Sequence, residues 1–142
     1  MKSLKLAVGS IALASFFFFS CSKTDPKSSA SSKIVGTWQY YTGINDDNKN
    51  GVIDANDSVD SLEAFGIKVS FNANGTGYTT SLLDTSIQNL TWNLSNNDTQ
   101  LGIKLDTDST FTNVTIVSCT STQMQVRDDN DSTTSWINLI KL

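Results

Sequence analysis

The sequence predicts an all-β fold in which about eight short antiparallel strands between residues 34 and 142 close into a barrel or stack as a sandwich. From residue 34 onward, apolar side chains recur at every second position, which is the spacing of a strand with one buried face. The segments between these runs are short and rich in Asn, Asp and Gly, which favour tight turns. Because such connections are too short for helical crossovers, sequence neighbours are expected to pair as antiparallel strands.

The first expected strand covers residues 37–42, and a short helical turn is expected at residues 58–64, where the apolar spacing is nearly helical. The later strands are recognised by strict alternation, and they cover residues 65–71, 90–94, 101–105, 114–116, 124–126 and 136–142. Of the turns between them, the segment 72–75 ends in Gly75, which is expected to supply a positive φ. Periodicity alone leaves both the barrel and the sandwich open.

The first twenty residues are expected to be a secretory signal peptide. Lys2 and Lys5 precede an uncharged apolar run over residues 6–19, which is shorter than the roughly twenty residues that span a bilayer. The run ends in Phe18-Phe19-Ser20-Cys21, which resembles the lipobox of bacterial lipoproteins. The resemblance implies that residues 1–20 are removed and that Cys21 is lipidated, anchoring the protein to the outer membrane of a Gram-negative cell envelope, at the periplasmic face or the cell surface. The alternative is an ordinary secreted protein cut near the same place.

Residues 21–33 are expected to form the lipidated cysteine and a flexible tether. The segment holds five serines and the only proline, Pro26, and it has no large apolar side chain to bury. Removal of Lys2 and Lys5 with the signal changes the formal net charge from −4 to −6. This acidic balance, with Arg127 as the only arginine, excludes the basic surface that nucleic-acid binding requires.

The residue inventory predicts a protein that is not an enzyme. The chain has no histidine, which excludes His-activated nucleophiles, an imidazole base and His-ligated zinc. Cys119 would be the only cysteine left in the folded part, and its place near the end of a strand predicts a small buried filler. Aspartates that could form an acid and base pair lie in expected turns, where Asp is a common residue: Asp106, Asp108, Asp128, Asp129 and Asp131.

Residues 46–57 match the twelve-residue pattern of a calcium loop. Oxygen donors stand at positions 1, 3, 5, 9 and 12 of the loop, and Gly51 stands at position 6, where the chain must bend sharply. Ile53 stands at position 8, where an apolar residue is expected to pack beneath the ion. The expected ligands are side-chain oxygens and, at position 7, a backbone carbonyl: Asp46, Asn48, Asn50, Val52, Asp54 and Asp57.

This loop is expected to hold a structural calcium ion between strands. Asp57 occupies the last position, where helix-loop-helix proteins usually carry glutamate, and in this respect the loop resembles the dockerin variant, which uses aspartate there. No amphipathic helix is expected before it. Three formal charges among the ligands predict a dissociation constant of roughly 0.1–1 mM, typical of extracellular modules. The alternative is an Asn- and Asp-rich loop that stays solvated and binds no ion.

Gly36-Thr37-Trp38 opens the first expected strand and is similar to the Gly-x-Trp signature of lipocalins. Together with residues 71–77, FNANGTG, and residues 92–94, WNL, it resembles the lipocalin-like domains of bacterial lipoproteins over residues 34–142. The resemblance implies an eight-stranded up-and-down barrel. It also implies that Trp38 closes the narrow end and packs on a late arginine, for which Arg127 is the only candidate.

The resemblance implies a lipid-anchored binding module that holds a small apolar ligand in the barrel mouth. An eight-stranded barrel can instead be filled by its own side chains, and inward rows containing Phe65, Ile67, Phe71 and Trp92 would do so. The alternative function is therefore a calcium-stabilised surface protein of structural or adhesive type, which binds protein or glycan without a ligand in its interior.

Overall fold

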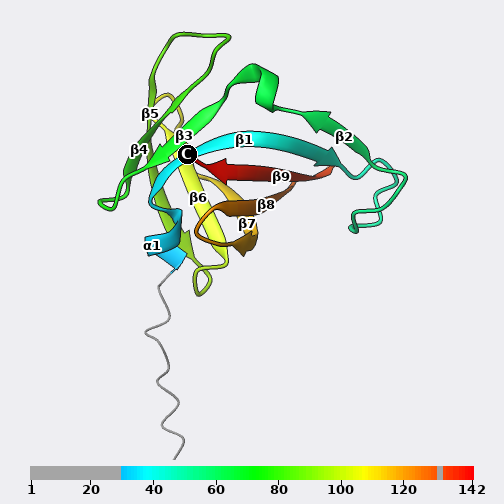
Figure 1. Cartoon of the computed structure of the whole chain (residues 1–142). Coiled ribbons are helices and arrows are strands. Elements are labelled where there is room, and N and C mark those ends of the chain that lie inside the picture. The colour runs from blue at the N-terminus through cyan, green and yellow to red at the C-terminus, as the bar shows by residue number, and fades with distance from the viewer. Residues whose placement is uncertain (1–29, 131–132) are drawn as a thin grey trace, which may run out of the picture.

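The computed structural model describes residues 30–130 and 133–142, which form a closed antiparallel β-barrel with one additional strand (Figure 1). Each strand pairs with the next around the sheet, and β1 also pairs with β9, which closes the ring. This confirms the all-β fold and the eight-stranded barrel, and it excludes the sandwich. The elements are α1 Ala30–Ile34, β1 Gly36–Asn45, β2 Ser58–Ser61, η1 Glu63–Phe65, β3 Lys68–Phe71, β4 Thr76–Thr80, β5 Gln88–Ser95, β6 Gln100–Leu105, β7 Thr112–Cys119, β8 Gln123–Asp129 and β9 Thr134–Lys141.

The additional strand, β2, pairs only with the far half of β1. The near half of β1 pairs with β3 in the barrel wall, whereas Thr42 to Asn45 pair with β2. In Figure 1, β2 and the loop before it extend to the right, away from the barrel. The helical turn expected over residues 58–64 is wrong in its first half, because Ser58–Ser61 complete a ladder with β1 and the 3-10 helix η1 begins only at Glu63.

The antiparallel order places the connections at two opposite ends of the barrel. One end carries α1, the β3–β4, β5–β6 and β7–β8 turns and the C-terminus, and we call it the closed end. The other end carries the loop 46–57 and the β4–β5, β6–β7 and β8–β9 connections, and we call it the loop end. The expected signal peptide, Cys21 and the tether up to residue 29 lie outside the described residues. The last residues of the expected tether belong to α1.

Trp38 closes the end of the barrel beneath α1. Its side chain has no exposed surface, and its Nε1 donates a hydrogen bond of 2.7 Å to the Ile34 carbonyl. The Lys141 ammonium lies 5.0 Å from the centre of the Trp38 ring and also donates to the Lys33 carbonyl at 2.8 Å. Carbonyls at the end of a helix lack intrahelical partners, so these two side chains satisfy groups that would otherwise be orphaned.

Arg127 does not occupy the position expected from the resemblance to lipocalins. Its Nε forms an ion pair with Asp129 at 2.9 Å, and its strand partner is Trp136. Trp136 in turn pairs with Ile44, six residues along β1 from Trp38, which corresponds to about 20 Å. The expected pair of Trp38 and Arg127 is therefore wrong, and Lys141, the direct strand partner of Trp38, supplies the cation instead.

The inward rows of the strands form one apolar core. Phe71 and Trp92 are buried and meet edge to face, with ring centres 5.5 Å apart, as the alternation predicts. The Trp92 indole donates to the carbonyls of Asn72 and Thr76, and Gly75 has the expected positive φ of 82°. Phe65 and Ile67 depart from the expected inward rows. Phe65 lies in η1 and is 41% exposed, and Ile67 precedes β3, is partly buried and does not belong to the core cluster.

Candidate functional site

The loop 46–57 joins β1 to β2 at the loop end of the barrel. Its first residue, Asp46, directly follows β1, and the Asp46 amide donates to the Thr134 carbonyl of β9 at 3.0 Å. At its other end, the Asp47 carboxylate accepts a hydrogen bond of 2.9 Å from the Ser58 amide, where β2 begins. Both ends of the loop are thus attached to the sheet, and its middle is held by contacts among its own residues.

The Asp46 carboxylate organises the first half of the loop. The Asn50 amide donates to Asp46 Oδ1 at 3.0 Å, and the Gly51 amide donates to Asp46 Oδ2 at 2.6 Å. Asp46 is consequently only 4% exposed, although it lies in a surface loop. Lys49 and Gly51 both have left-handed φ values, 58° and 74°. Gly51 therefore supports the sharp bend that a calcium loop requires.

The side chains at positions 3 and 5 of the loop both bond the carboxylate at position 9. Asn48 Nδ2 donates to both oxygens of Asp54, at 3.2 and 3.1 Å, and Asn50 Nδ2 donates to Asp54 Oδ2 at 2.7 Å. The Asn56 amide also donates to Asp54, and this bond, followed by those from Asn50 and Asn48, lowers the pKa of the carboxyl below its ordinary value. Asp54 is thus ionised at neutral pH. Because amide nitrogens face it, coordination of a cation here requires both asparagines to turn their oxygens inward.

Asp57, the last expected ligand, has one oxygen without a partner. Its Oδ2 accepts a hydrogen bond of 2.8 Å from the Asp54 amide, whereas its Oδ1 is buried and has no hydrogen-bond partner in the described part of the chain. A buried polar atom without a partner costs about 1–3 kcal/mol, and a hard cation is one partner that would offset this cost. The donor set of carboxylate and amide oxygens therefore fits calcium in its chemistry.

The described residues contain no group of three acidic, cysteine or histidine side chains arranged to share one metal ion. Asp46 turns toward backbone amides, the Asp54 carboxylate accepts from Asn48, Asn50 and Asn56, and the Asp57 carboxylate accepts from the backbone amide of Asp54. Val52 is exposed, and its amide donates to Asn50 Oδ1 at 2.8 Å. Ile53 is 43% exposed and does not pack beneath the centre of the loop, so that expectation is wrong.

The barrel interior holds an apolar cavity of about 50 Å³. This is far below the roughly 300–1,000 Å³ of typical ligand pockets. Tyr40 lines the cavity, and burial raises the pKa of its phenol, which is therefore neutral at physiological pH. The remaining lining side chains are all apolar: Val69, Phe71, Leu101, Ile103, Val114, Met124, Val126, Ile137 and Leu139.

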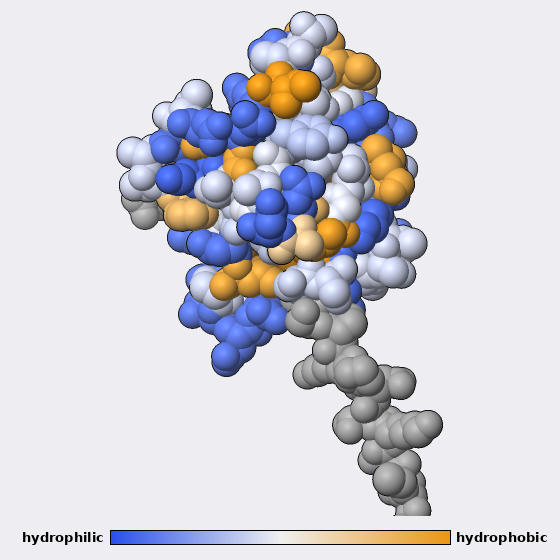
Figure 2. All heavy atoms as spheres, turned by 90° about the vertical axis from the view of Figure 1, so that its left-hand side faces the viewer, coloured by the Kyte–Doolittle hydropathy of each residue, from blue (hydrophilic) through white to orange (hydrophobic). Residues whose placement is uncertain are grey.

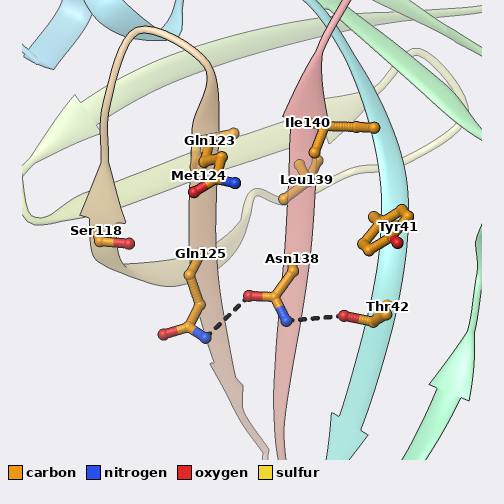
Figure 3. A pocket seen from close by; sticks show the side chains of 9 residues that line it. All are labelled: Tyr41, Thr42, Ser118, Gln123, Met124, Gln125, Asn138, Leu139 and Ile140. Carbon is orange, nitrogen blue, oxygen red and sulfur yellow. Dashed lines mark hydrogen bonds between the residues drawn. The ribbon is translucent and has the colours of Figure 1, made fainter.

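The structure also contains a groove of about 420 Å³ on the outer wall, over β1, β9, β8 and β7 (Figure 3). Its residues include Thr42, Gln125 and Asn138, none of which the sequence analysis selected. The alternation does place these polar residues on the outward face of their strands. The register of four strands decides which of these residues lie side by side. The sequence of one strand alone does not reveal that register.

Apolar residues are also exposed at the loop end. The β4–β5 connection carries exposed Leu82, Leu83 and Ile87. Figure 2 looks onto the left-hand side of Figure 1 and shows the apolar residues there as separate patches among hydrophilic ones. Separate exposed apolar residues are common on folded proteins, so the described residues on this side of the barrel give no argument for an apolar docking face.

Comparison of the chain with protein-family models, with curated proteins and with solved structures finds no match. Among the described residues, no helix has the length and apolar character needed to cross a membrane.

Proposed function

We propose that this protein is a lipid-anchored structural or adhesion module of the cell envelope, stabilised by calcium, which binds a protein or glycan partner on its outer surface. The observation that carries the proposal is the filled barrel. A cavity of about 50 Å³ is smaller than the roughly 150 Å³ apolar cavity that accommodates benzene. The small size of the interior cavity therefore favours a partner bound on the outer surface over a small apolar ligand inside the barrel.

Native mass spectrometry of the protein, extracted gently in mild detergent, tests this choice between interior and exterior binding. We expect the lipidated chain without a co-purifying apolar molecule, because the core side chains occupy the interior. A stoichiometric apolar ligand that protects the core from unfolding would contradict the proposal and would favour the second candidate, a binding module with its ligand inside the barrel.

The calcium part of the proposal rests on the loop 46–57. Its donors are the ones that a hard cation prefers, Gly51 makes the required bend, and Asp57 Oδ1 is buried without a hydrogen-bond partner among residues 30–130 and 133–142. Asp46, Asn48, Asn50, Asp54 and Asp57 would offer side-chain oxygens, and Val52 would offer its carbonyl. The ion would fasten the loop to the adjoining ends of β1 and β2 and thereby stabilise the loop end of the barrel.

Addition of 10 mM calcium to chelator-treated protein is expected to raise the free energy of unfolding by about 1.4–2.7 kcal/mol, given a dissociation constant of roughly 0.1–1 mM. Guanidinium titrations with and without calcium measure this increase. Magnesium at the same concentration is expected to have a smaller effect, because it loses its hydration water reluctantly.

Asp46→Asn and Asp47→Asn form a matched pair for this test, since each removes one negative charge with little change in shape. Asp46 is an expected ligand, whereas Asp47 bonds the Ser58 amide at the margin of the loop. The calcium effect should fall by at least half in Asp46→Asn and persist in Asp47→Asn. An equal calcium effect in both variants, or none in the unaltered protein, would mean that the loop binds no calcium.

Cys21→Ser is expected to move the protein from the membrane fraction to the soluble fraction of the cell envelope. The substitution removes the thiol that would carry the lipid, and each buried methylene of a lipid chain contributes about 0.8 kcal/mol to anchoring. Fractionation of cells followed by intact-mass analysis measures both location and lipid. Ser22→Ala is the control and should leave the protein in the membrane. Membrane retention of Cys21→Ser at the mass of an unmodified chain would contradict the anchor.

A further inference from the structure

The groove on the outer wall is built from a row of polar side chains that crosses four strands. Thr42 of β1 pairs with Asn138 of β9, Asn138 pairs with Gln125 of β8, and Gln125 pairs with Ser118 of β7. Direct cross-strand partners have Cβ atoms about 5 Å apart, so the four side chains form a continuous line, as Figure 3 shows. Residues distant in sequence are thus brought into one site by register alone.

Two β-bulges lie at the two ends of this row. The register of β1 against β9 shifts between Tyr40 and Thr42, and the register of β7 against β8 shifts between Ile116 and Ser118. Each bulge adds one residue, Tyr41 and Val117, and both residues are exposed. Bulges bend a strand and redirect its side chains. Here they place Tyr41 on the same outward face as Thr42, beside the polar row.

The row is internally ordered but keeps unused hydrogen-bonding groups. Gln125 Nε2 donates to Asn138 Oδ1 at 2.9 Å, and Asn138 Nδ2 donates to Thr42 Oγ1 at 2.8 Å (Figure 3). This chain of bonds fixes the orientation of both amides. In the described part of the chain, no hydrogen bond uses Gln125 Oε1 or the Ser118 hydroxyl, and each amide nitrogen retains a second N–H. The groove therefore presents both unused donors and unused acceptors.

The lining of the groove defines the class of ligand. All nine lining residues are uncharged, which gives no basis for recognising a charged ligand. Sugar hydroxyls both donate and accept hydrogen bonds, which matches oriented amides, and the Tyr41 ring offers an apolar surface for the C–H face of a sugar. The volume of about 420 Å³ lies within the range of small-molecule sites.

The same strands argue against a peptide. Main-chain addition of a peptide requires an unpaired strand edge. β7, β8 and β9 are each paired on both sides, and β1 is paired with β9 on one side and with β3 and β2 on the other. The groove thus offers a closed wall with side-chain groups only.

We propose that this groove binds a neutral oligosaccharide, with Tyr41 as the stacking platform and Asn138 and Gln125 as the hydrogen-bonding residues. This inference rests on the proposed function, because it names the surface and the ligand class of the same adhesion module. Recognition does not require calcium, since the groove lies on the barrel wall and shares no residue with the loop 46–57.

The test uses the full lipidated chain in a detergent without a sugar headgroup, labelled with ¹⁵N. A panel of neutral tri- to hexasaccharides of glucose, galactose, mannose and N-acetylglucosamine is titrated to 10 mM. We expect at least one to shift the side-chain amide signals of Asn138 and Gln125. We also expect Tyr41→Ala and Asn138→Ala each to weaken that binding at least about fivefold.

Tyr78→Ala and Asn89→Ala are the matched controls. Tyr78 on β4 is 40% exposed, against 43% for Tyr41, and Asn89 lies exposed on β5. Both controls should bind as the unaltered protein does, and denaturation midpoints show that every variant is folded. If an oligosaccharide binds but the groove variants bind it equally well, the groove is not the binding site, while the proposed adhesion function stands. If no member of the panel binds, the inference is overturned, whereas the proposed function fails separately if mass spectrometry finds an apolar ligand inside the barrel.

Discussion

Trp38→Ala is expected to lower the free energy of unfolding by about 3–5 kcal/mol, the range for removal of a fully buried tryptophan. Trp38 has no exposed surface, packs at the closed end and donates the bond that satisfies the Ile34 carbonyl. Alanine would leave a cavity at this end, orphan that carbonyl and remove the ring beneath the Lys141 ammonium. A loss of this size is a large fraction of the 5–15 kcal/mol typical of a domain.

Guanidinium titration followed by circular dichroism measures the loss, and two variants divide it into parts. Trp38→Phe keeps most of the buried ring but removes the hydrogen bond, and we expect a loss of about 1–3 kcal/mol. Tyr41→Ala, an exposed aromatic residue on the same strand, should cost less than about 1 kcal/mol. If Trp38→Ala and Tyr41→Ala have equal effects, Trp38 does not close the barrel.

Release of α1 provides a second measurement for Trp38→Ala. The bond after Lys33 is a trypsin site, and it adjoins Ile34, which is fully buried in the intact structure. Loss of the bond from Trp38 to the Ile34 carbonyl should free α1 from the barrel, so that trypsin cuts after Lys33 much faster than in the unaltered protein. Unchanged cleavage together with an unchanged midpoint would show that α1 is held by other contacts.

The barrel could be predicted from the sequence because a strand period of two is a local signal. Phe71 and Trp92 lie inward as the alternation requires, and Gly75 adopts its positive φ. The same alternation misplaced Phe65. A 3-10 helix at Glu63–Phe65 and the left-handed Gly66, with φ of 56°, break the strand before Lys68 and carry Phe65 out of the wall. Local alternation does not reveal such a break.

The residues that the sequence analysis missed or misplaced are those that depend on register. Lys141 lies over Trp38 because the two residues are strand partners across the closure of β1 and β9. The groove depends on the registers of three strand pairs and on two bulges, and each bulge changes the face of every later residue on its strand. The loop 46–57 is the opposite case, because all its expected ligands lie within twelve consecutive residues. Even there, exposed Ile53 shows that side-chain packing does not follow from spacing alone.

Gly77→Ala is expected to destabilise the barrel by about 3 kcal/mol, at the upper end of typical overpacking. Gly77 is buried on β4 between Phe71 of β3 and Leu90 of β5. A Cβ atom there would overlap the Ser70 carbonyl oxygen and lie 2.9 Å from Leu90 Cδ1. Because the Ser70 oxygen belongs to the backbone of the neighbouring strand, rotation of a side chain cannot relieve the overlap, and β3 and β4 must move apart.

Gly43→Ala is the matched control for Gly77→Ala, since both glycines lie within strands of the same sheet. A Cβ atom on Gly43 would meet only the end of the Leu62 side chain, at 3.3 Å. Alanine also restricts the unfolded chain more than glycine does, so Gly43→Ala should change the free energy of unfolding by less than about 1 kcal/mol. Guanidinium titration of both variants decides the question. Equal effects would mean that β3 and β4 do not approach each other as closely at Gly77 as the structure indicates. The filled barrel interior depends on this close approach, because it is what lets Phe71 and Leu90 pack on either side of Gly77.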